Sequence, residues 1–403
     1  MGSGPGGIDR GLLRVAAIVG VAELGFATVV PLLPLYLKEH LGASATLVGL
    51  VVATFAAVET LFKTTWGSVA DRIGRRPVII WGLVLASIAP LLMTLLRSAW
   101  LFVPLRLIDG IGSAALWPAA AAVMADRTTG ERRATAMGTL NMFFLSGLAL
   151  GPSLGLFVSG FTGSYRVGFY LASALLLAAA MLAARVFPEG DHAPDRAHHQ
   201  TPGAWAGGLL RGIRQSPLLL SMLLVAFIQM VGVGLLAPIL VIYAHEVVRL
   251  SDPLIGALFL VIVLGVAIAS VPGGRMADRI GRPRTVMWGM VMASLGMWLL
   301  PLAGRGHLAI LGVAALLLGG SYAVSSPAWL ALMSEAAPTG STGMVMGASE
   351  TAQGAGLIIG PLLGGFLYDS LGPQIPFVAS AALLTACAAL AIVVLRPRAA
   401  TQP

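Results

Sequence analysis

The sequence has little charge and almost no cysteine. Asp, Glu, Lys and Arg make up 10% of its 403 residues, against about 25% in soluble domains. Cys387 is the only cysteine, which excludes a disulfide within the chain and gives no thiolate metal site. The chain also lacks a nucleotide-binding P-loop and any cluster of nucleophile, base or metal ligands. We therefore expect no enzyme activity, catalytic residue, metal or cofactor.

What the sequence has in abundance is apolar residues. They make up 57% of the chain, and the mean hydropathy is +0.90. Apolar runs of roughly 20 residues match the length that a helix needs to cross a bilayer core of about 30 Å. In lipid the backbone groups must be paired within the segment, so helices are expected. The sequence predicts an all-α membrane protein with twelve transmembrane helices, at 12–37, 46–69, 78–97, 100–124, 135–158, 165–186, 217–243, 253–276, 285–303, 308–332, 343–368 and 375–396.

The basic residues cluster in alternate loops. The formal net charge is +8, but the arginines form no docking face, so we expect no nucleic-acid partner. Arg72, Arg75 and Arg76 follow the second span, and Arg132 and Arg133 follow the fourth. The positive-inside rule then places both termini and the central loop in the cytoplasm. We expect a multi-pass protein in contact with the lipids of a bacterial or archaeal cytoplasmic membrane.

One loop sequence occurs twice. Residues 67–77 read GSVADRIGRRP, and residues 274–284, 207 positions later, read GRMADRIGRPR. The same offset relates Pro31 to Pro238, and an offset of 209 relates Pro118 to Pro327. Parallel repeats of this kind are a known plan for transporters. The repeat predicts two pseudo-symmetric six-helix bundles, at 1–187 and 217–403, joined by a cytoplasmic linker at 188–216.

A second repeated pattern lies in the fifth and eleventh spans. Small residues recur at every fourth position next to a proline, which lets helix backbones approach closely. The residues are Gly147, Gly151, Pro152 and Gly155, and in the second half Gly356, Gly360, Pro361 and Gly364.

Charged residues inside spans are few. Arg106 and Asp109 are three residues apart in the fourth span, Glu59 and Lys63 are four apart in the second, and Glu23 lies in the first. Each spacing allows a pair on one helix face. A charge at membrane depth costs at least about 2.5 kcal/mol and normally faces the bundle interior. The pairs either hold their helices or take part in a network that responds to protons, and both interpretations stay open.

These motifs resemble those of the major facilitator superfamily, and within it the twelve-span drug–proton antiporter branch. The resemblance covers essentially the whole chain. The loop at Gly67–Pro77 is similar to the family's first motif, Arg106 matches an arginine linked to proton coupling, and the Gly147–Gly155 pattern marks antiporters. The resemblance implies proton-coupled efflux of small lipophilic, cationic compounds by alternating access. It also implies that the proton gradient supplies the energy and that the protein works as a monomer.

The resemblance assigns residues to roles. In the family an arginine at the position of Arg75 pairs with an acid at the position of Asp126 and latches one conformation, and Arg282 and Glu335 repeat this pair. Gly67 would also permit close helix approach. The gating residues are then Gly67, Asp71, Arg72, Arg75, Asp126, Gly274, Asp278, Arg279, Arg282 and Glu335. In the second copy the order of Pro283 and Arg284 is reversed, which predicts a weaker latch.

Spans 1, 4, 7 and 10 usually line the cavity in this family. Proton coupling is expected at Glu23, Asp109, Arg106, Glu59 and Lys63. Substrate binding is expected at Glu23, Trp117, Asn141, Gln229, Trp329, Glu350 and Gln353.

Two alternatives remain. The chain could export or flip a lipid, sugar or other metabolite, or it could be a transporter-like receptor or lipid-binding protein without turnover. The latch residues in both halves favour transport, because a static binder needs no two-state gate.

Overall fold

The fold is all-helical, as the sequence predicts. The computed structural model describes residues 9–128, 131–187, 217–303, 307–337 and 342–394, and no strand occurs among them. Eleven helical segments in the described ranges are long and apolar enough to cross a membrane. The first half contains α1 Arg10–Glu39, α2 Ala45–Ile73, α3 Arg75–Met93, the short 3-10 helix η1 Ala99–Leu101, α4 Phe102–Ala114, α5 Leu116–Asp126, α6 Glu131–Thr162 and α7 Tyr165–Val186. The second half contains α9 Pro217–Leu236, α10 Ile239–Glu246, α11 Asp252–Ile280, α12 Arg282–Leu299, α13 Leu308–Ala336, α14 Thr342–Leu371 and α15 Ile375–Val394.

The chain divides into two compact units. Unit 1 is Met1–Arg196 with Leu250–Ala257, and unit 2 is Ala197–Arg249 with Leu258–Pro403. The division at residue 196 falls within the predicted linker 188–216, which lies outside the described residues. Helix α11 starts in unit 1 and continues in unit 2.

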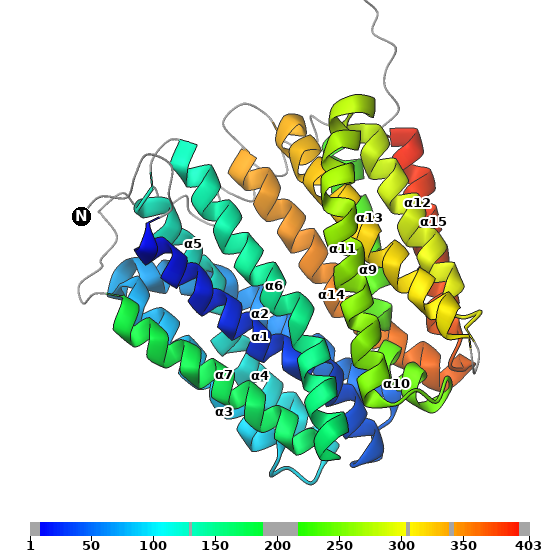
Figure 1. Cartoon of the computed structure of the whole chain (residues 1–403), viewed down its shortest axis with the longest axis horizontal. Helices are drawn as coiled ribbons and strands as arrows, with labels where there is room; N and C mark the ends of the chain where they lie inside the picture. The colour runs from blue at the N-terminus through cyan, green and yellow to red at the C-terminus, as the bar shows by residue number, and fades with distance from the viewer. Residues whose placement is uncertain (1–8, 129–130, 188–216, 304–306, 338–341, 395–403) are drawn as a thin grey trace, which may run out of the picture. The chain divides into compact units, whose positions relative to one another are not determined.

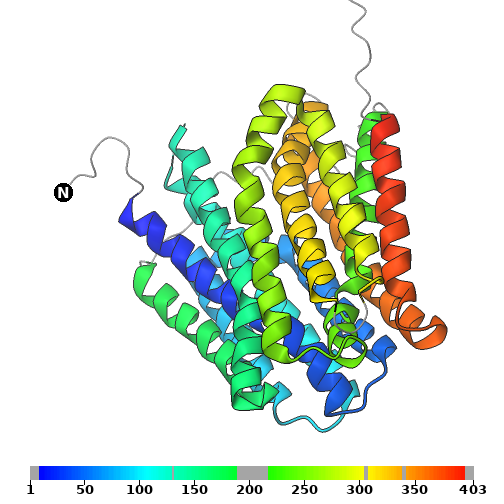
Figure 2. The same ribbon diagram turned by 45° about the vertical axis from the view of Figure 1, so that its right-hand side comes forward.

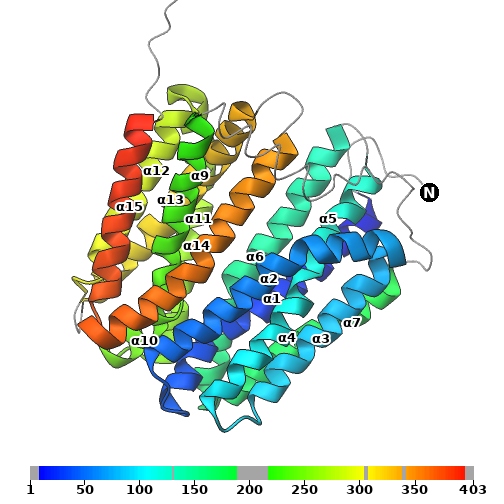
Figure 3. The same cartoon turned by 180° about the vertical axis from the view of Figure 1, so that it is seen from behind.

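In unit 1, α1 is the central helix. It packs along α6 and α7, while α4 packs against α2 and α3 (Figures 1 and 3). Small buried residues such as Ala16, Ala22 and Ala115 line the core beside Val19 and Leu83. Short side chains at these positions let neighbouring helix backbones come close.

Unit 2 repeats this packing with its own helices. α9 packs on α14 and α15, and α12 packs on α13 and α15. In Figure 2 the red α15 runs beside the yellow-green α12. α12 covers most of the predicted span 285–303 and ends at Leu299. It is an 18-residue helix whose first turn contains Arg282 and Arg284, and it is not among the eleven strongly apolar segments.

Two of the predicted spans consist of two consecutive helices each, although each still counts as one membrane-crossing segment. The span 100–124 consists of α4 and α5, separated at Ala115, whose N–H bonds to the carbonyl of Gly112 at 3.3 Å. The span 217–243 consists of α9 and α10, separated at Ala237 and Pro238. A proline removes an N–H from the helix ladder and crowds the preceding turn. Pro31, its repeat partner, nevertheless lies inside the continuous α1, so the proline alone does not determine the break.

The turn between α2 and α3 depends on one glycine. Gly74 has φ of 94°, and Gly281 has φ of 85° in the corresponding turn between α11 and α12. Glycine adopts this left-handed region without the Cβ clash of other residues. The next helix starts directly after the glycine, which accounts for the glycine at this motif position.

The glycine that opens the motif has a different environment from the expected one. A Cβ added at Gly67 or at Gly274 would meet no atom within 4 Å. The expectation that Gly67 mediates close helix approach is therefore wrong for its own unit.

Candidate functional site

The charged side chains inside the spans of unit 1 lie close enough to act on one another. Lys63 Nζ lies 3.1 Å from Glu59 Oε1, one turn apart on α2. The charges of Glu59 and Lys63 both act on Glu23, which is half-buried in the middle of α1. The structure therefore brings the predicted proton-coupling residues of α1 and α2 together.

The second pair lies on α4 and is buried. Arg106 Nη1 pairs with Asp109 Oδ2, and the two residues are 6% and 2% exposed. The guanidinium of Arg106 stacks over the ring of Phe55 on α2, 4.4 Å from its centroid. The charge of Glu59 also acts on Asp109, so the α2 and α4 pairs belong to one cluster.

Two polar atoms of the α4 pair lack a partner. Arg106 Nε and Asp109 Oδ1 are buried and have no hydrogen bond to any described residue. A buried polar atom without a partner costs about 1–3 kcal/mol. Arg106 Nε would donate to a water or a ligand acceptor, and Asp109 Oδ1 would accept from a water, a proton or a ligand donor.

The Gly147–Gly155 pattern seats α6 directly on α1. A Cβ at Gly147 would lie 2.8 Å from Glu23 Cβ, a Cβ at Gly151 would lie 2.9 Å from the carbonyl oxygen of Leu24, and Gly155 faces the backbone of Thr28. These contacts fix the position of Glu23 along the axis of α6. The predicted close approach at this motif is thus present, and it touches the main candidate for proton binding.

Unit 2 makes the same contact without a charge. A Cβ at Gly356 on α14 would lie 2.7 Å from Met230 Cβ on α9, and Gly360 and Gly364 meet the next turns of α9. Met230 therefore occupies the position equivalent to Glu23. Gln229, the neighbouring polar residue, is half-buried.

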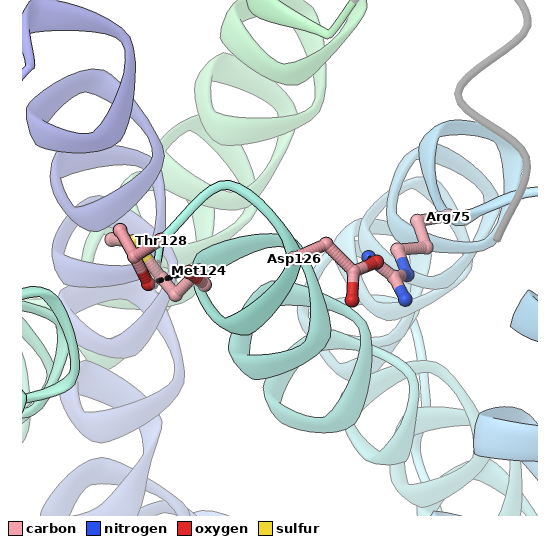
Figure 4. A network of polar contacts seen from close by, with 4 residues as sticks. All are labelled: Arg75, Met124, Asp126 and Thr128. Atoms are coloured by element: carbon pink, nitrogen blue, oxygen red, sulfur yellow. Dashed lines mark hydrogen bonds and ion pairs between the residues drawn. The ribbon is translucent and has the colours of Figure 1, made fainter. Parts of the chain in front are cut away.

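Each unit contains one predicted latch pair. Arg75 at the start of α3 pairs with Asp126 at the end of α5, and the two side chains point toward one another in Figure 4. The Thr128 hydroxyl donates to the Met124 carbonyl at 2.6 Å and closes the helix end beside them (Figure 4). Arg76 donates to the Ala184 carbonyl in the last turn of α7, at 2.9 Å.

The latch pair of unit 2 is more exposed. Arg282 Nη1 pairs with Glu335 Oε1, with the two side chains 47% and 58% exposed, against 9% and 38% for Arg75 and Asp126. Solvent screening makes exposed pairs weaker. The remaining gating candidates lie exposed near helix ends: Asp71, Arg72, Asp278 and Arg279.

The predicted substrate-binding residues are spread over both units. Trp117 is half-buried and packs edge-on against Phe144, with ring centroids 4.8 Å apart, and Asn141 is exposed on α6. In unit 2, Trp329 packs against the hydrophobic core, Gln353 Nε2 donates to Ser349 Oγ at 3.1 Å, and Glu350 is exposed. Glu23 and Trp117 are the ones within unit 1 that combine partial burial with a polar or aromatic group.

Two tyrosine–glutamate hydrogen bonds are not predicted by the sequence. The Tyr165 hydroxyl donates to Glu39 Oε2 at 3.1 Å, and the Tyr368 hydroxyl donates to Glu246 Oε2 at 3.1 Å. The two acids are repeat partners, but the tyrosines are not: Tyr165 opens α7 and Tyr368 lies near the end of α14. The repeat signalled the acids and could not signal their donors.

Two pseudo-symmetric six-helix repeats are a known plan for membrane transporters. The family model of the Major Facilitator Superfamily matches residues 15–247 and 222–403. The chain belongs to this superfamily and is a multi-pass membrane transport protein with a small-molecule substrate, not an enzyme.

Several known proteins are similar over almost the full length. The chain is 26% identical over 362 residues to multidrug resistance protein 2 of Bacillus subtilis (strain 168), covering 89% of this chain and 88% of that protein. It is 26% identical over 386 residues to the class C tetracycline resistance protein of Escherichia coli, covering 94% and 96%. The crystal structure of the peptide transporter POT in complex with sulfate matches with a TM-score of 0.76 at 15% identity, covering 98% and 95%. At that identity the likeness shows the fold alone.

Proposed function

We propose that this protein exports small lipophilic cations across a bacterial cytoplasmic membrane in exchange for protons, by alternating access. The observation that carries the proposal is the placement of Glu23: a half-buried carboxyl within α1, seated against Gly147 of the antiporter-like motif and acted on by Glu59 and Lys63. The similarity to multidrug and tetracycline resistance proteins supports export of drug-like compounds.

Antiport follows when the proton and the substrate cation bind in turn to one carboxylate, Glu23. A carboxylate at membrane depth is stabilised either by a proton or by a nearby cation, and one such group serves both in turn. A substrate cation that enters from the cytoplasm would displace the proton from Glu23, and a proton that enters from outside would displace the cation. Because each ligand excludes the other, export is coupled to proton entry.

The latch pairs would set which conformation the empty carrier prefers. Arg75–Asp126 ties α3 to α5 in unit 1, and Arg282–Glu335 ties α12 to α13 in unit 2. With the arginine-rich loops on the cytoplasmic side, both pairs lie at cytoplasmic helix ends. We propose that breaking them accompanies cytoplasmic opening. The energy source would be the proton gradient with no cofactor, and the functional unit a monomer surrounded by lipid.

Transport by the purified protein in liposomes tests the proposal. An internal pH dye reports proton movement when tetraphenylphosphonium is added under an imposed pH gradient. We expect proton movement that depends on the cation, that is lost in Glu23→Gln, and that survives in Glu39→Gln. The control removes a carboxylate from the same helix, but Glu39 lies at the exposed end of α1 and has a tyrosine donor that glutamine can also satisfy.

The possible outcomes separate the alternatives. Cation-dependent proton movement that persists in folded Glu23→Gln would refute the role of Glu23. A folded wild-type protein that moves no protons with any monovalent lipophilic cation would refute cation antiport and favour export of a lipid, sugar or metabolite. Absence of turnover with those substrates as well would indicate a receptor or lipid-binding protein.

A further inference from the structure

The two units provide an internal control for the charged cluster, which we define as Glu23, Glu59, Lys63, Arg106 and Asp109. The contacts of α6 on α1 and of α14 on α9 are equivalent, with Gly147 against Glu23 and Gly356 against Met230. The repeat therefore allows each charged residue of unit 1 to be compared with its counterpart in unit 2.

The contact of α4 on α2 is also repeated. A Cβ at Gly110 would lie 3.0 Å from the Phe55 carbonyl oxygen, and Gly319 of α13 faces the Ile262 carbonyl of α11 in the same way. With this alignment the five charged residues correspond to five uncharged ones. In the order given above, the counterparts are Met230, Val266, Ser270, Ala315 and Leu318.

The charges are therefore not needed to build these helix contacts. Unit 2 forms the same close glycine contacts with apolar or small residues at the five positions. Charge in a low-dielectric interior opposes folding unless it is fully paired. Because the scaffold forms without these charges, a purely structural role does not account for them.

The charges of the cluster do not cancel. Lys63 pairs with Glu59, and Arg106 pairs with Asp109, which leaves the Glu23 carboxylate without an ion pair among the described residues. Three carboxylates and two cations give one net negative charge. The charge of Glu59 acts on both Glu23 and Asp109, so α2 links the carboxyls of α1 and α4.

The buried pair also leaves an acceptor open. Asp109 Oδ1 has no hydrogen-bond donor among the described residues although Asp109 is only 2% exposed. This atom gives the cluster a second place where a proton or a bound water is stabilised, in addition to Glu23. The cluster is thus incomplete without a positively charged or proton-donating ligand.

We propose that the net charge of this cluster sets the valence of the substrate, with Lys63 as the specificity-determining residue. One monovalent cation or one proton neutralises the cluster, whereas a divalent cation would leave an excess positive charge in an apolar region. The Lys63 ammonium occupies the place that a second substrate charge would need. One monovalent cation then exchanges for one proton, and the exchange moves no net charge. This inference rests on the proposed function.

Charge substitution in liposomes tests the inference. The probes are tetraphenylphosphonium, which carries one charge, and dequalinium, which carries two, each measured by the proton movement it drives. For Lys63→Gln we expect the rate ratio of dequalinium to tetraphenylphosphonium to rise at least about tenfold, because a repelling charge is removed from the cluster. The double variant Glu59→Gln with Lys63→Gln restores one net negative charge and should return the ratio to the wild-type value.

Two further variants control for packing. Lys63→Arg keeps the charge and should keep the wild-type ratio. Ser270→Gln places the same amide side chain at the equivalent, exposed position of unit 2 and should leave the rate ratio unchanged.

In the wild type, tetraphenylphosphonium exchange should not respond to a membrane potential imposed with potassium and valinomycin.

Each result decides a different point. A ratio unchanged in Lys63→Gln, with exchange of tetraphenylphosphonium intact, overturns the inference and leaves the proposed function standing. The same holds if the double variant behaves like Lys63→Gln, because the charge sum would then not be the cause. A wild type without cation–proton exchange overturns the proposed function and this inference with it.

Discussion

Replacing Gly147 by alanine should destabilise the protein, because α6 touches the backbone of α1 at this residue. The added Cβ would lie 2.8 Å from both Glu23 Cβ and Leu24 N, and it would overlap the carbonyl oxygen of Gly20. Carbon atoms in ordinary contact are about 3.5–4.0 Å apart, so the two backbones must separate by about 1 Å.

The magnitude follows from two opposing effects. Overpacking of this kind costs about 1–3 kcal/mol. Alanine in place of glycine within a helix returns about 1 kcal/mol. We expect a net loss of about 1–2 kcal/mol for Gly147→Ala, visible as a lower thermal midpoint of the far-ultraviolet circular dichroism in detergent.

Gly67→Ala is the matched control in the same unit. A Cβ at Gly67 meets no atom within 4 Å, so only the helix-propensity gain of about 0.5–1 kcal/mol remains, and the midpoint should rise slightly. Gly356→Ala should destabilise as much as Gly147→Ala, because its Cβ would lie 2.7 Å from Met230 Cβ.

Transport assays distinguish the two destabilised variants, Gly147→Ala and Gly356→Ala. Gly147→Ala moves a carboxyl and should change the pH profile of proton exchange, whereas Gly356→Ala moves a methionine and should leave the profile in place. The reasoning is refuted if Gly147→Ala and Gly67→Ala shift the thermal midpoint in the same direction. Equal changes of the pH profile in the two destabilised variants would refute the link between Gly147 and Glu23.

Two other substitutions test the ion pairs. Arg106→Ala alone should cost about 3–5 kcal/mol of stability, because it leaves the buried Asp109 charge unpaired. The double variant Arg106→Ala with Asp109→Leu has the side chains that unit 2 has at the equivalent positions. It should keep the thermal midpoint near that of the wild type and still abolish proton exchange. A double variant that unfolds as readily as the single one would show that the pair is structural. Arg75→Met should lower the thermal midpoint more than Arg282→Met, because the Arg75 side chain is 9% exposed and that of Arg282 is 47% exposed. Exposed ion pairs contribute only about 0–1 kcal/mol. Equal losses of stability in the two variants would refute this ranking.

The sequence was sufficient for the class of the protein and for the order of its helices. Apolar runs of membrane-spanning length with few charges allow only helices in lipid. The repeat of the Gly67–Pro77 loop predicts the six-plus-six plan, and the resemblance to the family implies the pairing of Arg75 with Asp126 that the structure contains. These features are local or periodic, so a single chain displays them directly.

Other features depend on tertiary contacts. Pro31 and Pro238 are repeat partners, yet α1 continues through Pro31, whereas the span 217–243 is divided into α9 and α10 at Pro238. Gly67 and Gly147 look alike as small residues in helices, but Gly147 alone has a helix backbone against it. Sequence periodicity shows which residues share a face, not which face meets a neighbour.

The sequence by itself determined that unit 1 contains intramembrane charges at Glu23, Glu59, Lys63, Arg106 and Asp109, since residue type and span boundaries are both readable from it. Only the tertiary structure decided that the charges of α1, α2 and α4 act on one another, that Asp109 keeps an open acceptor, and that unit 2 builds the same contacts without them. The physical reason is distance: electrostatic coupling between helices depends on their packing, and packing is set by side chains far apart in the chain.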